Sequence, residues 1–169
     1  EGIQVIGGRP SDFKLFEDKI GVAGDSVLTY WIRPSNARGR CVGLDLLFAD
    51  GSTLRDSGAR TAAGQGTHPG NPKGEVGKWT QVTIPLGQAL AGKVISAVLV
   101  AYDSRDGGGP FEAWIDDIAL ESAQTPAGVM GVQRTIYLDE LRWVRADLTP
   151  PATPAGAQAM TFERHVDLA

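Results

Sequence analysis

Alternation of apolar and polar residues dominates this sequence, and it is the feature that most constrains the fold. The clearest example is the stretch from Gly109 to Leu120, which alternates until two carboxylates, Asp116 and Asp117, follow one another. Because side chains of a β-strand point alternately to the two faces of the sheet, this pattern predicts a half-buried strand. Helical periodicity is nearly absent from the rest of the chain.

Six further segments carry β-strand signals, since they alternate or are rich in β-branched and aromatic residues, and turn residues separate them. These segments are residues 13–20, 26–33, 40–49, 52–55, 79–84 and 93–102. Asp50 and Gly51 predict a tight hairpin turn between the third and the fourth. A single helical turn is expected at Gly87–Leu90. A second acidic segment, residues 135–143, repeats the pattern of the first stretch and is a further candidate strand.

The composition agrees with many short strands joined by turns. The 169 residues include 22 glycines and 10 prolines, which favour turns over long helices, and 42% of the residues are hydrophobic. This length and hydrophobic content suffice for one domain with its own core. We therefore expect an all-β fold, an antiparallel β-sandwich of the jelly-roll kind. Residues 57–78 are expected to form a long loop, and loops of this length are often functional.

Charge and hydropathy argue against two classes of partner. The net charge is −4 at pH 7, and no basic stripe interleaved with aromatic residues is present, so no nucleic acid is expected as a partner. No apolar run approaches the roughly 20 residues that span a bilayer, so no membrane is expected either. Cys41 is the single cysteine, cannot form an intrachain disulfide, and is most simply a small core residue.

Residues for catalysis or for a zinc site are scarce. His68 and His165 lie far apart with no Gly-x-Ser-x-Gly motif near either, and one cysteine with two distant histidines does not make a zinc site. Asp116 and Asp117 are expected on opposite faces of their strand, so they cannot form a catalytic pair. Either of them is a candidate calcium ligand, and so is Asp103 with the Gly-rich backbone that follows it. A polar turn is an equally good interpretation of that Gly-rich segment.

Aromatic and polar side chains around the long loop are candidate contacts for a sugar, because indole and phenol rings stack on sugar rings while their polar edges bind hydroxyls. The candidate ligand-binding residues are Trp79, Tyr102, Arg60, His68 and Asp56. Trp79 closes the long loop, and Tyr102 ends a strand at the Gly-rich segment. Trp31, Trp114 and Trp143 are most simply core residues, and each polar candidate is also interpretable as a solvated loop side chain.

The C-terminal part of the chain changes in composition. Residues 147–157 are rich in proline and lack a hydrophobic period, so they are expected to form a linker. Residues 158–169 alternate again and predict one strand. This Pro-rich entry into a strand resembles the start of fibronectin type III domains, which would make the chain a piece of a longer multidomain protein. Residues 1–146 then form the sandwich domain.

Five motifs occur in a characteristic order in the first two thirds of the chain: residues 27–34, 43–58, 90–95, 98–103 and 114–118. In this order they resemble the galactose-binding-like carbohydrate-binding modules of secreted bacterial glycosidases, α-mannosidase-type multidomain enzymes among them. The resemblance covers residues 2–120. It implies a jelly-roll sandwich, often with a structural Ca²⁺, and a saccharide site in loops at one end or on one face. Asp116 or Asp117 is the calcium ligand that this resemblance best supports.

The resemblance implies a non-catalytic accessory module of a larger secreted glycoside hydrolase. Its expected partners are an oligo- or polysaccharide and the neighbouring catalytic domain of the same polypeptide, and its expected location is extracellular and bacterial. Two alternatives stay open. One is a structural spacer without a ligand, and the other is a jelly-roll lyase or hydrolase, which would need Asp56, His68 and Asp103 in one cleft.

Overall fold

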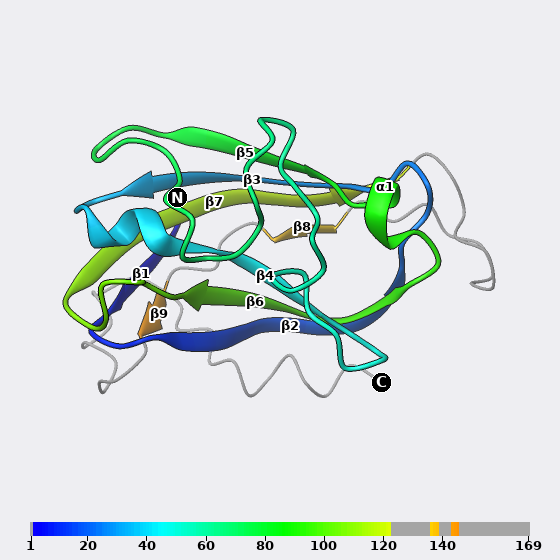
Figure 1. Cartoon of the computed structure of the whole chain (residues 1–169), viewed down its shortest axis with the longest axis horizontal. Helices are drawn as coiled ribbons and strands as arrows, with labels where there is room; N and C mark the ends of the chain where they lie inside the picture. Colours follow the sequence, from blue (N-terminus) through cyan, green and yellow to red (C-terminus); the bar gives the residue numbers. More distant parts are fainter. Residues whose placement is uncertain (1, 123–135, 139–142, 146–169) are drawn as a thin grey trace, which may run out of the picture.

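The computed structural model describes residues 2–122, 136–138 and 143–145. These residues form two β-sheets packed face to face, so the chain is an all-β sandwich, as the sequence predicted (Figure 1). The strands are β1 (Ile3–Gly7), β2 (Ser11–Gly21), β3 (Val27–Pro34), β4 (Val42–Phe48), β5 (Thr80–Pro85), β6 (Val94–Tyr102), β7 (Phe111–Glu121), β8 (Ile136–Leu138) and β9 (Trp143–Arg145). A 3₁₀ turn, Arg38–Cys41, precedes β4, and the predicted helical turn is α1 (Gly87–Leu90).

The larger sheet has the strand order β5-β3-β7-β1-β9, with β8 paired to β7, and the smaller sheet has the order β2-β6-β4. From β1 to β7 each successive strand changes sheet, which is the connectivity of jelly rolls. All strand pairs are antiparallel except β1 with β9. The second acidic segment, residues 135–143, contains β8 and the first residue of β9, and both strands belong to the larger sheet. The predicted linker 147–157 and the predicted strand 158–169 lie outside the described residues.

The core lies between the two sheets and follows from the alternation of the strands. In β3, for example, Leu28, Tyr30 and Ile32 are at most 1% exposed, while the residues between them are only partly buried. In contrast, β4 is buried along most of its length on both sides. The reason is the long connection after β4, which places Arg55 against Asp45 and the Lys73 side chain against Gly43.

The hairpin turn predicted after β4 is present. Gly51 has a φ of 82°, which favours glycine, and its N–H donates to the carbonyl of Phe48 at 2.9 Å. The returning segment was predicted to be a strand over residues 52–55. It forms only an isolated bridge at Thr53. The N–H of Leu54 still donates to the carbonyl of Leu46 at 2.9 Å, but the chain then turns, because the N–H of Ser57 donates to the carbonyl of Leu54, and the Leu54 side chain is fully buried in the core. Only isolated bridges occur in the rest of the connection up to residue 79.

A β-bulge in β7 changes the expected direction of its two carboxylates. Asp117 and Ile118 together oppose the single residue Tyr30 of β3, and Asp117 has a φ of 47°. An extra residue of this kind shifts the alternation by one position. Ile115 and Ile118 are therefore both buried, and Asp116 and Asp117 both lie outside the core. The prediction that these two aspartates point to opposite faces is wrong for this reason.

Candidate functional site

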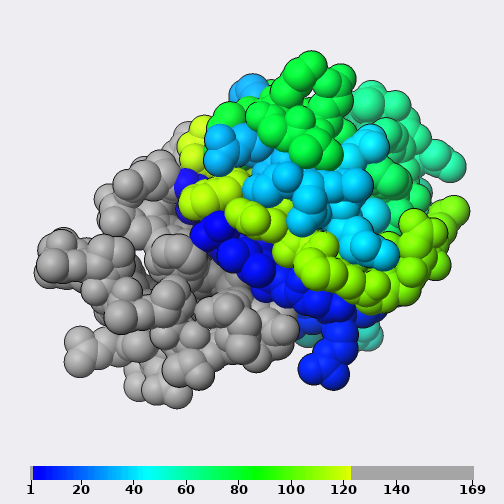
Figure 2. Space-filling model, turned by 90° about the vertical axis from the view of Figure 1, so that its left-hand side faces the viewer, coloured from blue at the N-terminus to red at the C-terminus, as the bar shows by residue number. Residues whose placement is uncertain are grey.

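Three tryptophans and one arginine gather on the outer face of the larger sheet. Trp31 and Arg33 of β3 occupy the positions that alternate with buried residues, and Trp114 does so in β7. Trp79 directly precedes β5 and is 40% exposed. We call Trp31, Arg33, Trp79 and Trp114 the aromatic strip. Three of its residues come from β3 and β7, Trp79 directly precedes β5, and these three strands lie side by side in the order β5-β3-β7. Their ends are visible as green, light blue and yellow-green bands (Figure 2).

The strand register places Arg33 between two indoles. Arg33 pairs directly with Trp114 across β3 and β7, and because Ile32 pairs with Thr80, Trp79 comes beside Arg33 on the other side. The guanidinium carbon of Arg33 lies 5.3 Å from the ring centroid of Trp79 and 5.6 Å from that of Trp114. Both distances are within the range of cation–π attraction. The charge of Arg33 therefore helps to hold the two rings in place.

Glu112, the acidic residue of β7 near Arg33, is hydrogen-bonded to a residue other than Arg33. Gln4 of β1 pairs with Trp114, and its side-chain amide donates to Oε1 of Glu112 at 2.8 Å. Within the described residues, no carboxylate lies at ion-pair distance from Arg33. A guanidinium presents several N–H donors in its plane, and within the described residues none of those of Arg33 is engaged in an ion pair. The aromatic strip thus combines flat apolar surfaces with a positive charge that has edge donors.

Trp79 is exposed, as a residue of a binding surface would have to be, whereas the expected burial of two other tryptophans is wrong. Trp31 and Trp114 were expected in the core, but both are half-buried on the outer face. The signal that could have shown this is their position, since each stands where its strand otherwise carries polar residues. Arg33 was not recognised, because its importance depends on the pairing of β3 with both neighbouring strands. The side chain of Trp143 lies outside the described residues.

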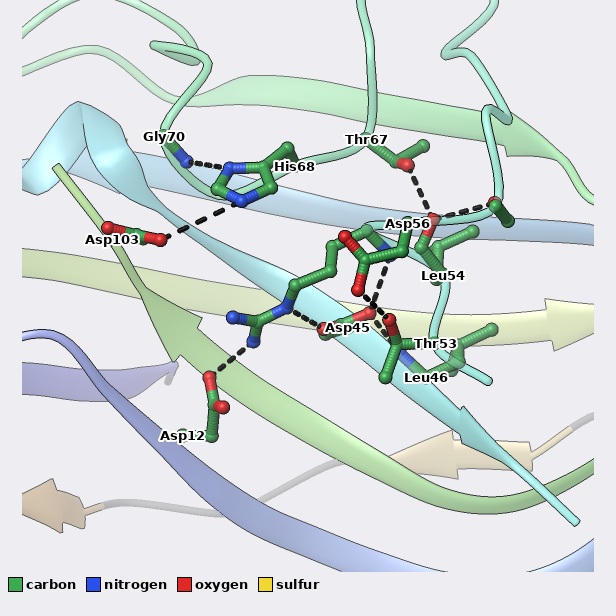
Figure 3. A network of polar contacts seen from close by, with 12 residues as sticks. Asp12, Asp45, Leu46, Thr53, Leu54, Asp56, Thr67, His68, Gly70 and Asp103 are labelled. Carbon is green, nitrogen blue, oxygen red and sulfur yellow. Dashed lines mark hydrogen bonds and ion pairs between the residues drawn. The ribbon is translucent and has the colours of Figure 1, made fainter. Parts of the chain in front are cut away.

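A second group of polar side chains lies where the long connection meets the end of β6 (Figure 3). The Nδ1 atom of His68 accepts a hydrogen bond from the N–H of Gly70 at 3.0 Å, so the neutral ring carries its proton on Nε2. That Nε2 atom lies 3.7 Å from Oδ2 of Asp103. Both side chains are more than a third exposed, so water screens their attraction.

Lys73 is a buried cation in the same loop, and nothing in the sequence indicated its burial. The residue is 4% exposed, and its backbone N–H donates to the carbonyl of Arg40 at 2.7 Å. Its ammonium group donates to three backbone carbonyls, those of His68 at 3.3 Å, Pro69 at 3.1 Å and Asn71 at 3.0 Å. Burial lowers the pKa of Lys73 to about 8, against the opposite effects of Cys41 and Asp45. The ammonium group thus organises the backbone of the loop that carries His68.

Tyr102, an expected ligand contact, is a core residue. Its side chain is 1% exposed, and its ring stacks on Phe111 with centroids 3.7 Å apart and an interplanar angle of 16°. The physical reason is that Tyr102 falls at the same strand parity as Val100, which points into the core. The expectation of an accessible ring at this position is therefore corrected.

The other polar candidates bind within their own loop. Asp56 accepts a hydrogen bond from the hydroxyl of Thr53 at 2.8 Å, which closes a tight turn. Arg60 donates to the carbonyl of Gly64 at 2.8 Å. The lyase or hydrolase alternative needs Asp56 in one cleft with His68 and Asp103. In Figure 3 Asp56 lies with Thr53, apart from the other two. The structure brings together His68 and Asp103 but adds no contact from Asp56.

The three expected metal ligands lie in different parts of the sandwich. Asp116 and Asp117 are at the bulge of β7 in the larger sheet, whereas Asp103 follows β6 of the smaller sheet and faces His68. Within the described residues, no group of three or more His, Cys, Asp or Glu side chains could hold a metal ion. These three carboxylates therefore do not fit a single calcium ion.

In the described part of the chain, no helix is long and apolar enough to cross a membrane.

Comparisons with known proteins leave the function to be inferred from the residues of the chain. No protein-family model and no curated protein matches this chain.

Proposed function

We propose that this chain is a non-catalytic carbohydrate-binding module of a larger secreted glycoside hydrolase, and that the aromatic strip is its binding surface. The observation that supports this proposal is the outward placement of Trp79, Trp31 and Trp114 on one sheet face. Indole rings offer flat apolar surfaces to the C–H faces of sugar rings, and neighbouring polar groups can bind the hydroxyls.

Exposed hydrophobic side chains support the same location. In the described part of the chain, two large hydrophobic residues are exposed: Val76, with 49% of its surface accessible, and Trp79, with 40%. Both belong to the segment that enters β5. Exposed apolar side chains that gather on one surface are typical of interaction sites.

The strands give the site a fixed shape before any ligand binds. Trp31, Arg33 and Trp114 stand on adjacent hydrogen-bonded strands, and Arg33 contacts both Trp79 and Trp114. A preformed site avoids the entropy cost of ordering side chains on binding. The proposed partners are an oligo- or polysaccharide at the strip and the catalytic domain of the same polypeptide, which the module would hold at its substrate.

Affinity gel electrophoresis and calorimetric titration against plant, fungal and bacterial polysaccharides test this proposal with the full 169-residue chain. We expect binding to at least one saccharide, and Trp79→Ala should weaken it about tenfold or more, because anchoring aromatic residues contribute strongly to binding. Lys14→Ala is the control, since Lys14 is exposed on β2 of the smaller sheet, away from the aromatic strip. If no saccharide binds, the spacer alternative replaces this proposal.

A further inference from the structure

Arg33 points to the chemical class of the saccharide. Building on the proposed function, we infer that the aromatic strip binds a carboxylate-bearing saccharide, a polymer of uronic acids. In this arrangement the carboxylate is bound by the edge of the Arg33 guanidinium, and the adjoining sugar rings stack on Trp79 and Trp114. The inference rests on the position of the charge between the two rings and on the partners of the neighbouring carboxylates.

The position of Arg33 favours a planar anion. Indole rings lie 5.3 and 5.6 Å from its guanidinium carbon, Arg33 is partly buried, and no hydrogen bond between described residues uses its N–H groups. A guanidinium stays charged at all relevant pH values and matches a carboxylate with two parallel hydrogen bonds. Partial removal of water strengthens such a contact relative to one in bulk solvent.

The carboxylates around Arg33 have other partners. Glu112 accepts the hydrogen bond of Gln4, and Asp116 accepts one from the N–H of Asp117 at 3.0 Å. The described residues thus supply no carboxylate within 4.0 Å of Arg33. A carboxylate of a ligand would complete the set of groups that the strip presents.

The net charge of the chain makes the inference sharply testable. At −4, the chain as a whole repels a polyanion at long range. A preference for an acidic polymer must then come from a local contact, and among the residues of the aromatic strip only Arg33 is positively charged. Removing this charge should therefore abolish the preference without abolishing stacking.

The test compares each acidic polymer with its own carboxyl-reduced form, which keeps the backbone and replaces each carboxylate by a hydroxymethyl group. Polymers of galacturonic, mannuronic and glucuronic acid serve as probes for the full chain. We expect at least one acidic form to bind roughly tenfold or more tightly than its reduced form, the effect of a hydrogen bond to a charged group. Arg33→Gln should bind both forms equally, Arg33→Lys should keep part of the difference, and Trp79→Ala should weaken both forms.

Each outcome separates the two proposals. Equal binding of acidic and reduced forms, or binding of neutral saccharides alone, overturns the acidic-saccharide inference and leaves the proposed function intact. Equal binding of dextran sulfate overturns the assignment to carboxylates. No binding to any saccharide overturns the proposed function itself. Circular dichroism and thermal unfolding of Arg33→Gln show whether a loss of preference comes from misfolding, and Arg33→Lys provides the second variant if it does.

Discussion

The stability of this domain should rise with pH above neutrality, because Lys73 is a buried cation. In the folded chain its pKa is lowered from 10.5 to about 8 by burial. An unfolded chain keeps the lysine protonated up to its ordinary pKa. Between these two values the unfolded state binds more protons than the folded state, so the free energy of unfolding increases with pH. The cost of holding the charge inside is present below pH 8 and is relieved as the pH rises.

The magnitude follows from the two pKa values. Titration of one group from about 8 when folded to 10.5 when unfolded raises the free energy of unfolding by about 2 kcal/mol between pH 7 and roughly pH 9.5. A second buried group limits the gain at higher pH. Burial raises the pKa of Tyr30 above its ordinary value of 10.0, so above that pH the unfolded chain ionises this tyrosine while the folded chain does not. Stability should then fall again.

Urea unfolding followed by tryptophan fluorescence at pH values from 7 to 9.5 measures this effect. Lys73→Met removes the titrating group but keeps an unbranched side chain of similar length, so its stability should not rise by the additional 2 kcal/mol or so over this range. The difference between the wild type and the variant at each pH isolates Lys73 from all other groups. Parallel curves for the two proteins would refute the reasoning, because they would mean that the three carbonyls keep the ammonium group protonated throughout.

Two further predictions concern a buried carboxylate and calcium. Asp45 is 1% exposed and accepts hydrogen bonds from the N–H of Leu46 and from Arg55, so Asp45→Ala should lower the free energy of unfolding by about 3 kcal/mol in urea. Asp50→Ala breaks an exposed pair with Lys93 and should lower the free energy of unfolding much less. Equal losses for the two variants would contradict this reasoning. If the chain binds the calcium that its resemblance implies, EDTA should lower the Tm, because an ion bound only to the folded state stabilises it; an unchanged Tm with no calcium by elemental analysis would remove that prediction.

The strands were predictable because their signals are local. The alternation in β3 and β7, the glycine after Asp50 and the helical turn at α1 all depend on neighbours within a few residues. The bulge at Asp117 was not predictable in this way, since it is defined by the pairing of β7 with Tyr30 on another strand. The burial of Lys73 also depends on distant partners, namely the carbonyl of Arg40 and the surface of β4.

The candidate site was only partly predictable for the same reason. Trp79 could be proposed because it stands between a long loop and a strand, and Trp31 and Trp114 could have been assigned to the outer face from their positions in the alternation. That Arg33 separates two indoles follows only from the order β5-β3-β7, which one sequence does not reveal.

The resemblance left two places for a saccharide, the loops at one end or one face of the sandwich, and the hydrogen bonds favour the face. In the loops the polar candidates already bind their own backbone: His68 accepts from Gly70, and Arg60 donates to Gly64. A ligand there would have to replace these contacts and would gain little, since one hydrogen bond is exchanged for another. On the face, the edge donors of Arg33 and the exposed ring of Trp79 can bind a ligand without breaking a contact between described residues. Binding at the strip therefore carries the smaller cost of reorganisation.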